Sequence, residues 1–222
     1  MHRLLILYFF FLPFISFSQL AMIELEAKPV PEPHTRNTAV ENWNRSQPAY
    51  KNLSAEARDF LYWVNFCRTK PESFWDSVIS PVLLVFPTLN KAEAKSLQAD
   101  LIKTGSLPMF YLNEALIKTA QLHASDISQK KALPSHISTD GTDFGSRMNR
   151  AGIKYCANEN ISISSQSILL SVLLLYLDIG LPNLGHRKAL LNPSLVETGI
   201  GAAPYGKEMS QLFLVQDLAC LQ

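Results

Sequence analysis

The sequence lacks an excess of charge of either sign: 20 lysines and arginines stand against 19 aspartates and glutamates in 222 residues. Nucleic acids and anionic membrane surfaces attract strongly basic proteins, so this balance gives no electrostatic case for either partner. We therefore expect no nucleic-acid partner.

Cysteine is also scarce, since only Cys67, Cys156 and Cys220 occur. Their spacing matches neither a zinc-binding motif nor a redox pair, and an odd number leaves at least one thiol unpaired within the monomer. Structural thiols are the favoured interpretation because free cysteines are often buried. A bridge between Cys156 and Cys220 is the alternative, and the sequence does not decide the pairing.

Long apolar runs are few, and the first lies at the beginning of the chain. His2 and Arg3 precede an almost unbroken apolar stretch over 4–15, and small residues then provide a cleavage site before Gln19. This pattern is typical of a signal peptide and is too short for a convincing transmembrane span. We expect residues 1–18 to be removed, leaving an exported protein, extracellular or periplasmic, without a transmembrane segment.

The second apolar run covers 167–177 and is also too short to cross a bilayer. It predicts a buried helix that ends where Asp178, Gly180 and Pro182 follow. A carboxylate at a helix carboxyl end is disfavoured by the backbone dipole, so Asp178 is expected to have an additional partner.

The region after the leader divides into two parts. Residues 19–52 mix several prolines with polar residues and show no lasting apolar period, which predicts a linker or an N-terminal arm. Residues 53–222 are the right length for one domain with a sizeable core.

Capping residues and apolar periods predict helices and strands within that domain. The strongest helix follows Asn113, because apolar residues recur there at steps of three and four. Other helices are expected from Ser54 to Thr69, over 91–103 before Gly105, and over 145–152. Strands are expected over 197–203 and 211–218, joined by a turn at 204–207, and 153–157 is expected to be extended. Helices followed by a terminal hairpin imply an α+β domain.

Three separated residues carry the chemistry that the sequence offers: His136, Glu159 and His186. Imidazole and carboxylate groups can both bind a divalent cation and transfer protons near neutral pH. His136 lies in an irregular loop, Glu159 stands between two asparagines, and His186 follows a glycine. His123, beside an apolar helix stripe, is expected to be structural. Ser135 precedes His136, but no nucleophile-elbow pattern surrounds it.

The order of several short motifs resembles the bacterial branch of the CAP superfamily, secreted domains also called SCP-like or PR-1-like. The resemblance covers 54–219 and is strong only when the motifs are taken together. The motifs are Asn65-x-x-Arg68-x-x-Pro71-x-x-Phe74, Leu116-x-x-x-Ala120-x-x-His123-Ala124-x-Asp126, Ser135-His136, Arg147-x-x-x-x-Gly152, Glu159-Asn160-Ile161, Gly185-His186-Arg187-x-x-Leu190-Leu191-Asn192-Pro193 and Gly199-Ile200-Gly201.

This resemblance implies a three-layer α-β-α sandwich with a central, mostly antiparallel sheet. It also implies a cleft lined by two histidines and acidic side chains, in which His136, Glu159 and His186 occupy the matching positions. Two departures bear on metal affinity. Asn158 stands where the family usually has glycine, and a second cleft glutamate has no counterpart, so that Asp178 is the closest available carboxylate.

Three functions remain open at this stage. The favoured hypothesis is a secreted, non-enzymatic binding module whose cleft holds a divalent metal, with Zn²⁺ on His136 and His186, or a small ligand. The second is a metal-assisted extracellular hydrolase of peptides or esters with Glu159 as general base. The third is a carrier of lipid or another apolar ligand. Neither the extracellular partner nor the oligomeric state follows from the sequence.

Overall fold

The computed structural model describes residues 25–164 and 167–222, so the expected signal peptide lies outside the described residues. Its middle layer is a four-stranded sheet in the order β1-β3-β4-β2. β1 (Tyr111–Leu112) pairs in parallel with β3 (Glu197–Tyr205). β4 (Gln211–Ala219) pairs antiparallel with both β3 and β2 (Ala157–Ser164). The sheet is therefore mostly antiparallel, as expected.

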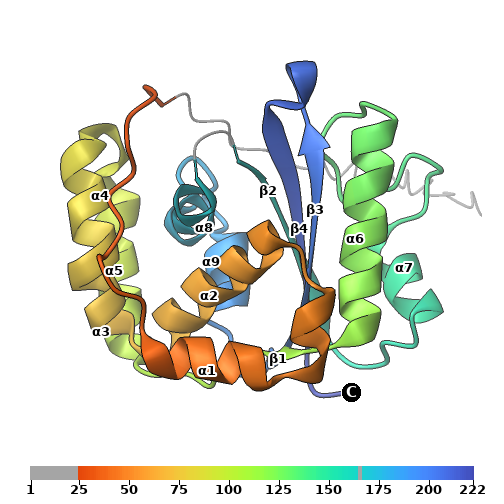
Figure 1. The fold of residues 1–222 in the computed structure, drawn as a ribbon, viewed down its shortest axis with the longest axis horizontal. Coiled ribbons are helices and arrows are strands. Elements are labelled where there is room, and N and C mark those ends of the chain that lie inside the picture. The colour runs from red at the N-terminus through yellow and green to blue at the C-terminus, as the bar shows by residue number, and fades with distance from the viewer. Residues whose placement is uncertain (1–24, 165–166) are drawn as a thin grey trace, which may run out of the picture.

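Helices cover both faces of this sheet and complete a three-layer α-β-α sandwich (Figure 1). α6 (Glu114–Gln129) and α7 (Phe144–Arg150) lie on one side, and α2 (Ala55–Thr69), α8 (Ile168–Leu177) and α9 (Gly185–Leu190) lie on the other. Beyond α2 and α8 stand α3 (Pro71–Phe74), η2 (Trp75–Ile79), α4 (Ser80–Val85), η3 (Pro87–Leu89) and α5 (Ala92–Thr104). The short turn η4 (Lys207–Met209) lies between β3 and β4.

Most helix boundaries follow from the capping residues that the sequence provides. The Ser54 hydroxyl accepts a hydrogen bond from the Ala57 amide at the start of α2, and Asn113 accepts from the Ala115 amide, 2.9 Å away, at the start of α6. Gly105 ends α5 with a φ of 66°, a backbone conformation that glycine adopts without strain. The α8 helix is buried, as its apolar sequence predicts, and none of the helices in the described ranges is long and apolar enough to span a membrane.

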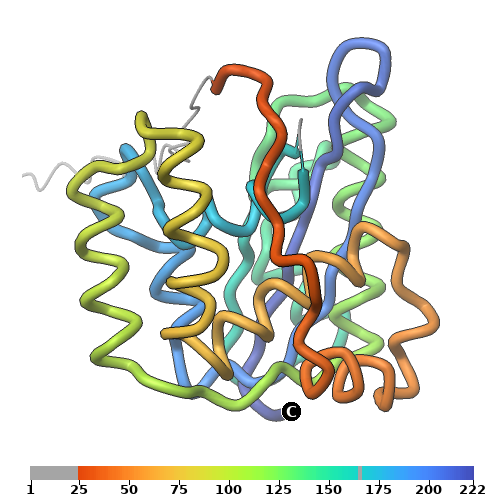
Figure 2. Tube along the Cα trace, turned by 60° about the vertical axis from the view of Figure 1, so that its left-hand side comes forward, coloured from red at the N-terminus to blue at the C-terminus, as the bar shows by residue number. Residues whose placement is uncertain are grey.

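The N-terminal arm is more ordered than the sequence suggests. It contains the helix α1 (Thr38–Ser46) and the turn η1 (Pro48–Asn52). Asn37 caps α1, and the buried Asn44 accepts a hydrogen bond from Asn65 of α2 at 2.8 Å. Arg36 forms an ion pair with Asp59 of α2, where the arm runs down to the base of the molecule (Figure 2). The segment is a packed arm. Its helix was not predicted, because the apolar period is short and its burial depends on contacts with α2.

Two glycines set the separation of α6 from the sheet. A side-chain carbon at Gly199 would collide with the backbone of Leu116 and Ile117, and one at Gly201 would collide with the backbone of Ala120. Only glycine allows a helix backbone to approach a strand this closely. The helix therefore rests directly on β3, as the small residues of that strand predict.

Strand β2 begins later than the sequence suggests. Of the stretch 153–157, only Ala157 belongs to the strand, because pairing with β4 starts at the match of Ala157 with Ala219. A disulfide between Cys156 and Cys220 closes that end of the pair. The favoured interpretation of three free thiols is therefore wrong and the bridge is the correct alternative, while Cys67 remains a buried free thiol.

Candidate functional site

Glu159 lies inside strand β2 rather than in a polar turn. Its side chain is only 1% exposed, and its Oε1 atom is 2.8 Å from the Nδ1 atom of His136. The structure therefore brings together two of the three predicted site residues, although they are 23 positions apart in the sequence.

Arg147 of α7 completes this cluster. One guanidinium nitrogen donates to the Oε2 atom of Glu159 at 2.5 Å. The other donates to the main-chain oxygen of His136 at 3.0 Å and to the hydroxyl of Ser138 at 3.2 Å. One side chain thus holds both the acid and the loop that carries the imidazole. We name His136, Glu159 and Arg147 the acid–imidazole cluster.

Neighbouring side chains fix the loop that carries His136. Asp126 of α6 accepts hydrogen bonds from the amide of Thr139 at 2.7 Å and from its hydroxyl at 2.5 Å. His123 is 1% exposed. Its ring nitrogens lie 2.8 Å from the Ser135 carbonyl oxygen and 3.2 Å from the Ser138 hydroxyl. Burial lowers the pKa of His123, so it remains a neutral structural residue, as predicted.

The electrostatics of the cluster favour an ionised Glu159. Burial opposes the charge, but the hydrogen bond with His136 and the positive charge of Arg147 outweigh burial and lower the pKa of Glu159. The pKa of Asp217, the neighbouring acid on β4, shifts in the opposite direction. Burial, and then the charge of Glu159, raise the pKa of Asp217 well above its usual value. The folded structure therefore disfavours the ionised form of Asp217.

Asp217 lies directly beside Glu159 because the two residues are paired across β2 and β4. The hydroxyl of Thr119 on α6 donates to the Oδ2 atom of Asp217 at 2.6 Å. Asp217 was not predicted as a site residue, although it is the one acid in the strand candidate over 211–218. Arg147 was predicted only as part of a motif.

The other predicted residues form a second pair. The Nδ1 atom of His186 on α9 is 2.6 Å from the Oδ1 atom of Asp178, which follows the last residue of α8. The amide of Arg187 donates to the second oxygen of Asp178 at 3.0 Å. These are the additional partners that a carboxylate at a helix carboxyl end requires.

The two pairs belong to different layers of the sandwich. Glu159 bonds to α7, while Asp178 and His186 belong to α8 and α9 on the other side of the sheet. Within 25–164 and 167–222, no group of three or more histidines, cysteines, aspartates and glutamates is arranged to hold a metal ion. A shared cleft for His136 and His186, and a zinc site within it, remain predictions.

His136 is the member of the cluster that solvent reaches. Its side chain is 41% exposed, and its Nε2 atom makes no hydrogen bond to any residue in the described ranges. Glu159 and Arg147 lie beneath it with exposed side-chain fractions of 1% and 10%. The cluster therefore presents one edge of an oriented imidazole to solvent. The ionised Glu159 beneath it has its charge balanced by Arg147.

Comparisons with known proteins agree with this architecture. The model of the CAP family, described as the cysteine-rich secretory protein family, matches residues 96–218, which is more than half of the chain. A comparison with curated protein sequences found no match.

Three solved structures are similar to parts of the chain. An extracellular protein with an SCP domain from Bacillus anthracis is 24% identical over 57% of this chain and 40% of that one, with a TM-score of 0.39. An outer surface protein from Borrelia burgdorferi is 18% identical over 60% of this chain and 96% of that one, with a TM-score of 0.44. A cysteine-rich secretory protein from Staphylococcus aureus is 13% identical over 60% of this chain and 38% of that one, with a TM-score of 0.36. This chain spans less than half of the first and third of these proteins.

The ordered motifs, the three-layer sandwich and the family-model match agree with one another, and the chain belongs to the CAP superfamily.

Proposed function

We propose that this CAP domain is an exported binding module rather than a hydrolase. The observation that carries the proposal is the state of Glu159, whose two oxygens are both engaged, one by His136 and one by Arg147, beneath the surface. Among the residues that the structure describes, Glu159 is the acid that contacts the exposed imidazole, and both of its oxygens are already occupied.

The chemistry of proton transfer supports this assignment. A general base works best when its pKa lies near the working pH, and enzymes raise the pKa of a glutamate to reach that range. In this site the pKa of Glu159 is lowered instead. A carboxylate bound to a guanidinium is a weak base, and a water molecule would have to displace one of its two partners to reach it.

The surroundings of His136 fit recognition of a partner. Leu133 and Ile137, on the same loop, have 84% and 52% of their surfaces exposed. Exposed apolar side chains around an oriented polar group are typical of interaction surfaces. An extracellular protein or small molecule with an apolar part and a hydrogen-bonding group would fit this loop. The expected signal peptide supplies the export that such a function requires.

Two experiments test the proposal. The purified protein and Glu159→Gln are assayed against mixed peptide and ester substrates, with and without a chelator, and we expect no hydrolysis that depends on Glu159. Chelator-sensitive hydrolysis that disappears in a folded Glu159→Gln protein would establish the hydrolase instead.

The metal form of the proposal needs its own measurement. Calorimetric titration with Zn²⁺ compares the wild type with His136→Ala and with His34→Ala, a change at an exposed histidine of the N-terminal arm outside the proposed ligand set. Heat that is lost only in His136→Ala supports a metal-dependent site. Absence of heat in the wild type removes the metal from the proposal and leaves the binding function, while co-purified lipid detected by mass spectrometry would favour the carrier.

A further inference from the structure

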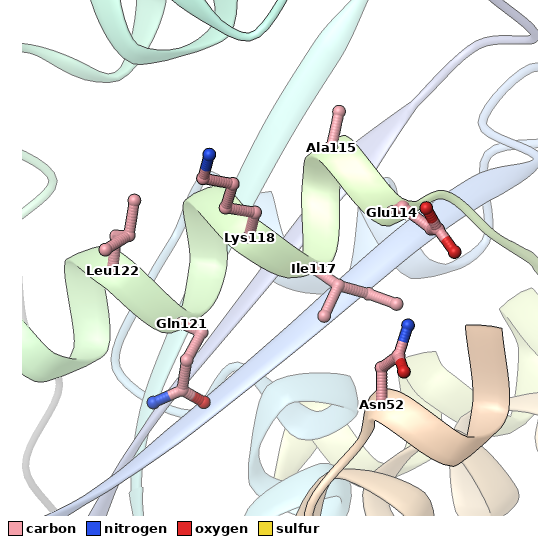
Figure 3. A pocket seen from close by; sticks show the side chains of 7 residues that line it. All are labelled: Asn52, Glu114, Ala115, Ile117, Lys118, Gln121 and Leu122. Atoms are coloured by element: carbon pink, nitrogen blue, oxygen red, sulfur yellow. The ribbon is translucent and has the colours of Figure 1, made fainter.

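The outer face of α6 carries two hollows that are separate from the exposed edge of His136. The first, of about 520 Å³, lies between α6 and η1 and is lined by Asn52, Ile117 and Gln121 among others (Figure 3). The second, of about 670 Å³, lies between α6, α7 and the loop over 138–142. In Figure 3, Ala115, Lys118 and Leu122 point away from Asn52, and these three residues line both hollows.

The second hollow has a floor of positioned polar groups. Arg147, with a side chain only 10% exposed, reaches it, and so do Thr119 and the buried His123. The Nε–H group of Arg147 is buried and has no acceptor among the residues that the structure describes. Pockets that bind small molecules usually combine an apolar wall with a few fixed polar groups of this kind. The partly exposed Leu122 supplies the wall here.

Positive charge gathers at one end of this hollow. Ala151 at the end of α7 packs in the same cluster as Ala115 near the start of α6. Lys118, one turn after Ala115, and Arg150, next to Ala151, both line the hollow, and we infer that they lie toward this same end. Lys118 makes no ion pair within the described residues, and Arg150 makes only a long hydrogen bond of 3.4 Å to Thr142.

Negative charge lies at the other end. Asp126 lines the hollow eight residues after Lys118 and is held there by Thr139. An α-helix rises 1.5 Å per residue, so the two side chains are rooted about 12 Å apart along α6. Asp140, on the rim, partly offsets the charge of Arg150. The hollow therefore has two ends of opposite charge and little net charge.

We propose that this hollow binds a short zwitterionic peptide. Its carboxylate would lie between Lys118 and Arg150, and its ammonium group would lie at Asp126. An extended chain spans about 3.5 Å per residue, so a separation of about 12 Å suits a peptide of about three residues. The site is distinct from the edge of His136, and it neither requires nor excludes the function proposed above.

Nuclear magnetic resonance titration of the full chain with triglycine tests this site. We expect saturable shifts confined to amides of α6, α7 and the loop over 138–142. Lys118→Gln should weaken triglycine about threefold, which is the size expected for one solvent-exposed ion pair. Lys95→Gln, a change at an exposed lysine on α5 in the other helical layer, is the matched control and should leave the affinity unchanged.

Blocked peptides test the proposed orientation. Triglycinamide lacks the carboxylate and N-acetyl-triglycine lacks the ammonium group, so each should bind more weakly than triglycine to the wild type. In Lys118→Gln, triglycinamide should bind almost as well as triglycine, whereas N-acetyl-triglycine should still bind more weakly by the same factor as in the wild type. In Asp126→Asn the acetylated peptide should bind almost as well as triglycine, and the amidated peptide should keep its loss of affinity. The proposal is overturned if triglycine causes no saturable shifts, if Lys95→Gln acts like Lys118→Gln, or if both blocked peptides respond alike in the two variants.

Discussion

The two helical layers of this protein each combine an arginine, a carboxylate and a histidine, but in different ways. On the α7 side, Arg147 points its guanidinium at Glu159, and Glu159 orients His136. On the α9 side, Asp178 orients His186, but the guanidinium of Arg187 turns away from it. Arg187 is 1% exposed and donates to the main-chain oxygens of Tyr176 and Leu177, among other acceptors.

We infer from this difference that the group bound by the arginine distinguishes the proposed recognition site from a structural contact. When the guanidinium neutralises the acid, as in the acid–imidazole cluster, the imidazole remains at the surface with 41% of its side chain exposed. Arg187 instead binds main-chain oxygens of α8 and α5 and the carboxylate of Asp100 on α5, so it ties α8 and α9 to α5, and the His186 side chain is only 20% exposed. Histidine–acid pairs are therefore not equivalent evidence for function.

The largest expected effect tests the structural role of Arg187. Arg187→Met should lower the free energy of unfolding by about 4 kcal/mol, because it leaves several buried acceptors without donors. Arg147→Met should cost about 2 kcal/mol, since Glu159 keeps His136 as a partner. Urea unfolding measures both, with Arg150→Met on the exposed surface as control. Equal losses for Arg187→Met and Arg147→Met would remove the distinction between the layers.

An intermediate effect concerns Asp217, whose raised pKa sets it apart from the neighbouring Glu159. The raised pKa of Asp217 means that the folded state holds a proton which the unfolded state releases above its usual pKa near 3.8. Stability from this group is complete below that pH and is lost as the pH rises toward the folded pKa, by up to about 1.4 kcal/mol per pH unit. Glu159, with its lowered pKa, contributes in the opposite sense: its stabilisation is complete above its usual pKa near 4.5 and is lost as the pH falls toward the folded pKa.

Asp217→Asn should therefore be more stable than the wild type above about pH 5, with a gap that widens as the pH rises. Melting temperatures between pH 4 and 8 measure it. Glu159→Gln removes the charge that helps to raise the pKa of Asp217. The pH range over which the wild type loses stability relative to Asp217→Asn should therefore be narrower when both proteins carry Glu159→Gln. Parallel curves for Asp217→Asn and the wild type would show that Asp217 is ionised in the folded state.

The smallest effect separates the two imidazoles. His136→Gln should cost about 0.5 kcal/mol, because Glu159 retains Arg147. His186→Gln should cost about 1.5 kcal/mol, because the buried Asp178 then keeps only the amide of Arg187. Guanidinium unfolding of the two single variants gives the comparison directly. A larger loss for His136→Gln would make it the structural histidine of the two.

Local signals predicted most of the fold. Ser54, Asn113 and Gly105 fixed helix ends, because capping depends on residues within one turn. The terminal hairpin was predicted from the turn signals over 204–207, although the structure extends β3 to Tyr205 and makes the turn over 206–210. The helix α1 was missed because its burial depends on contacts with α2 rather than on its own periodicity.

The candidate site was only partly predictable. The pairing of His136 with Glu159 and of His186 with Asp178 depends on which layer each segment enters, and the sequence does not state that. Asp217 reaches Glu159 only through the register of β2 with β4, which is a property of two strands together. The direction of each guanidinium likewise depends on distant main-chain oxygens.

The contact at Gly199 and Gly201 has a consequence for mutational surveys of this domain. Neither residue offers a functional group, yet a single added methyl at either position would push α6 away from β3. Thr119, His123 and Asp126 all belong to that helix, so the displacement would reach Asp217, the loop of His136 and the proposed peptide hollow at once. A survey that ranks positions by reactive chemistry would therefore overlook these two glycines, although the spacing between α6 and the sheet depends on their lack of a side chain.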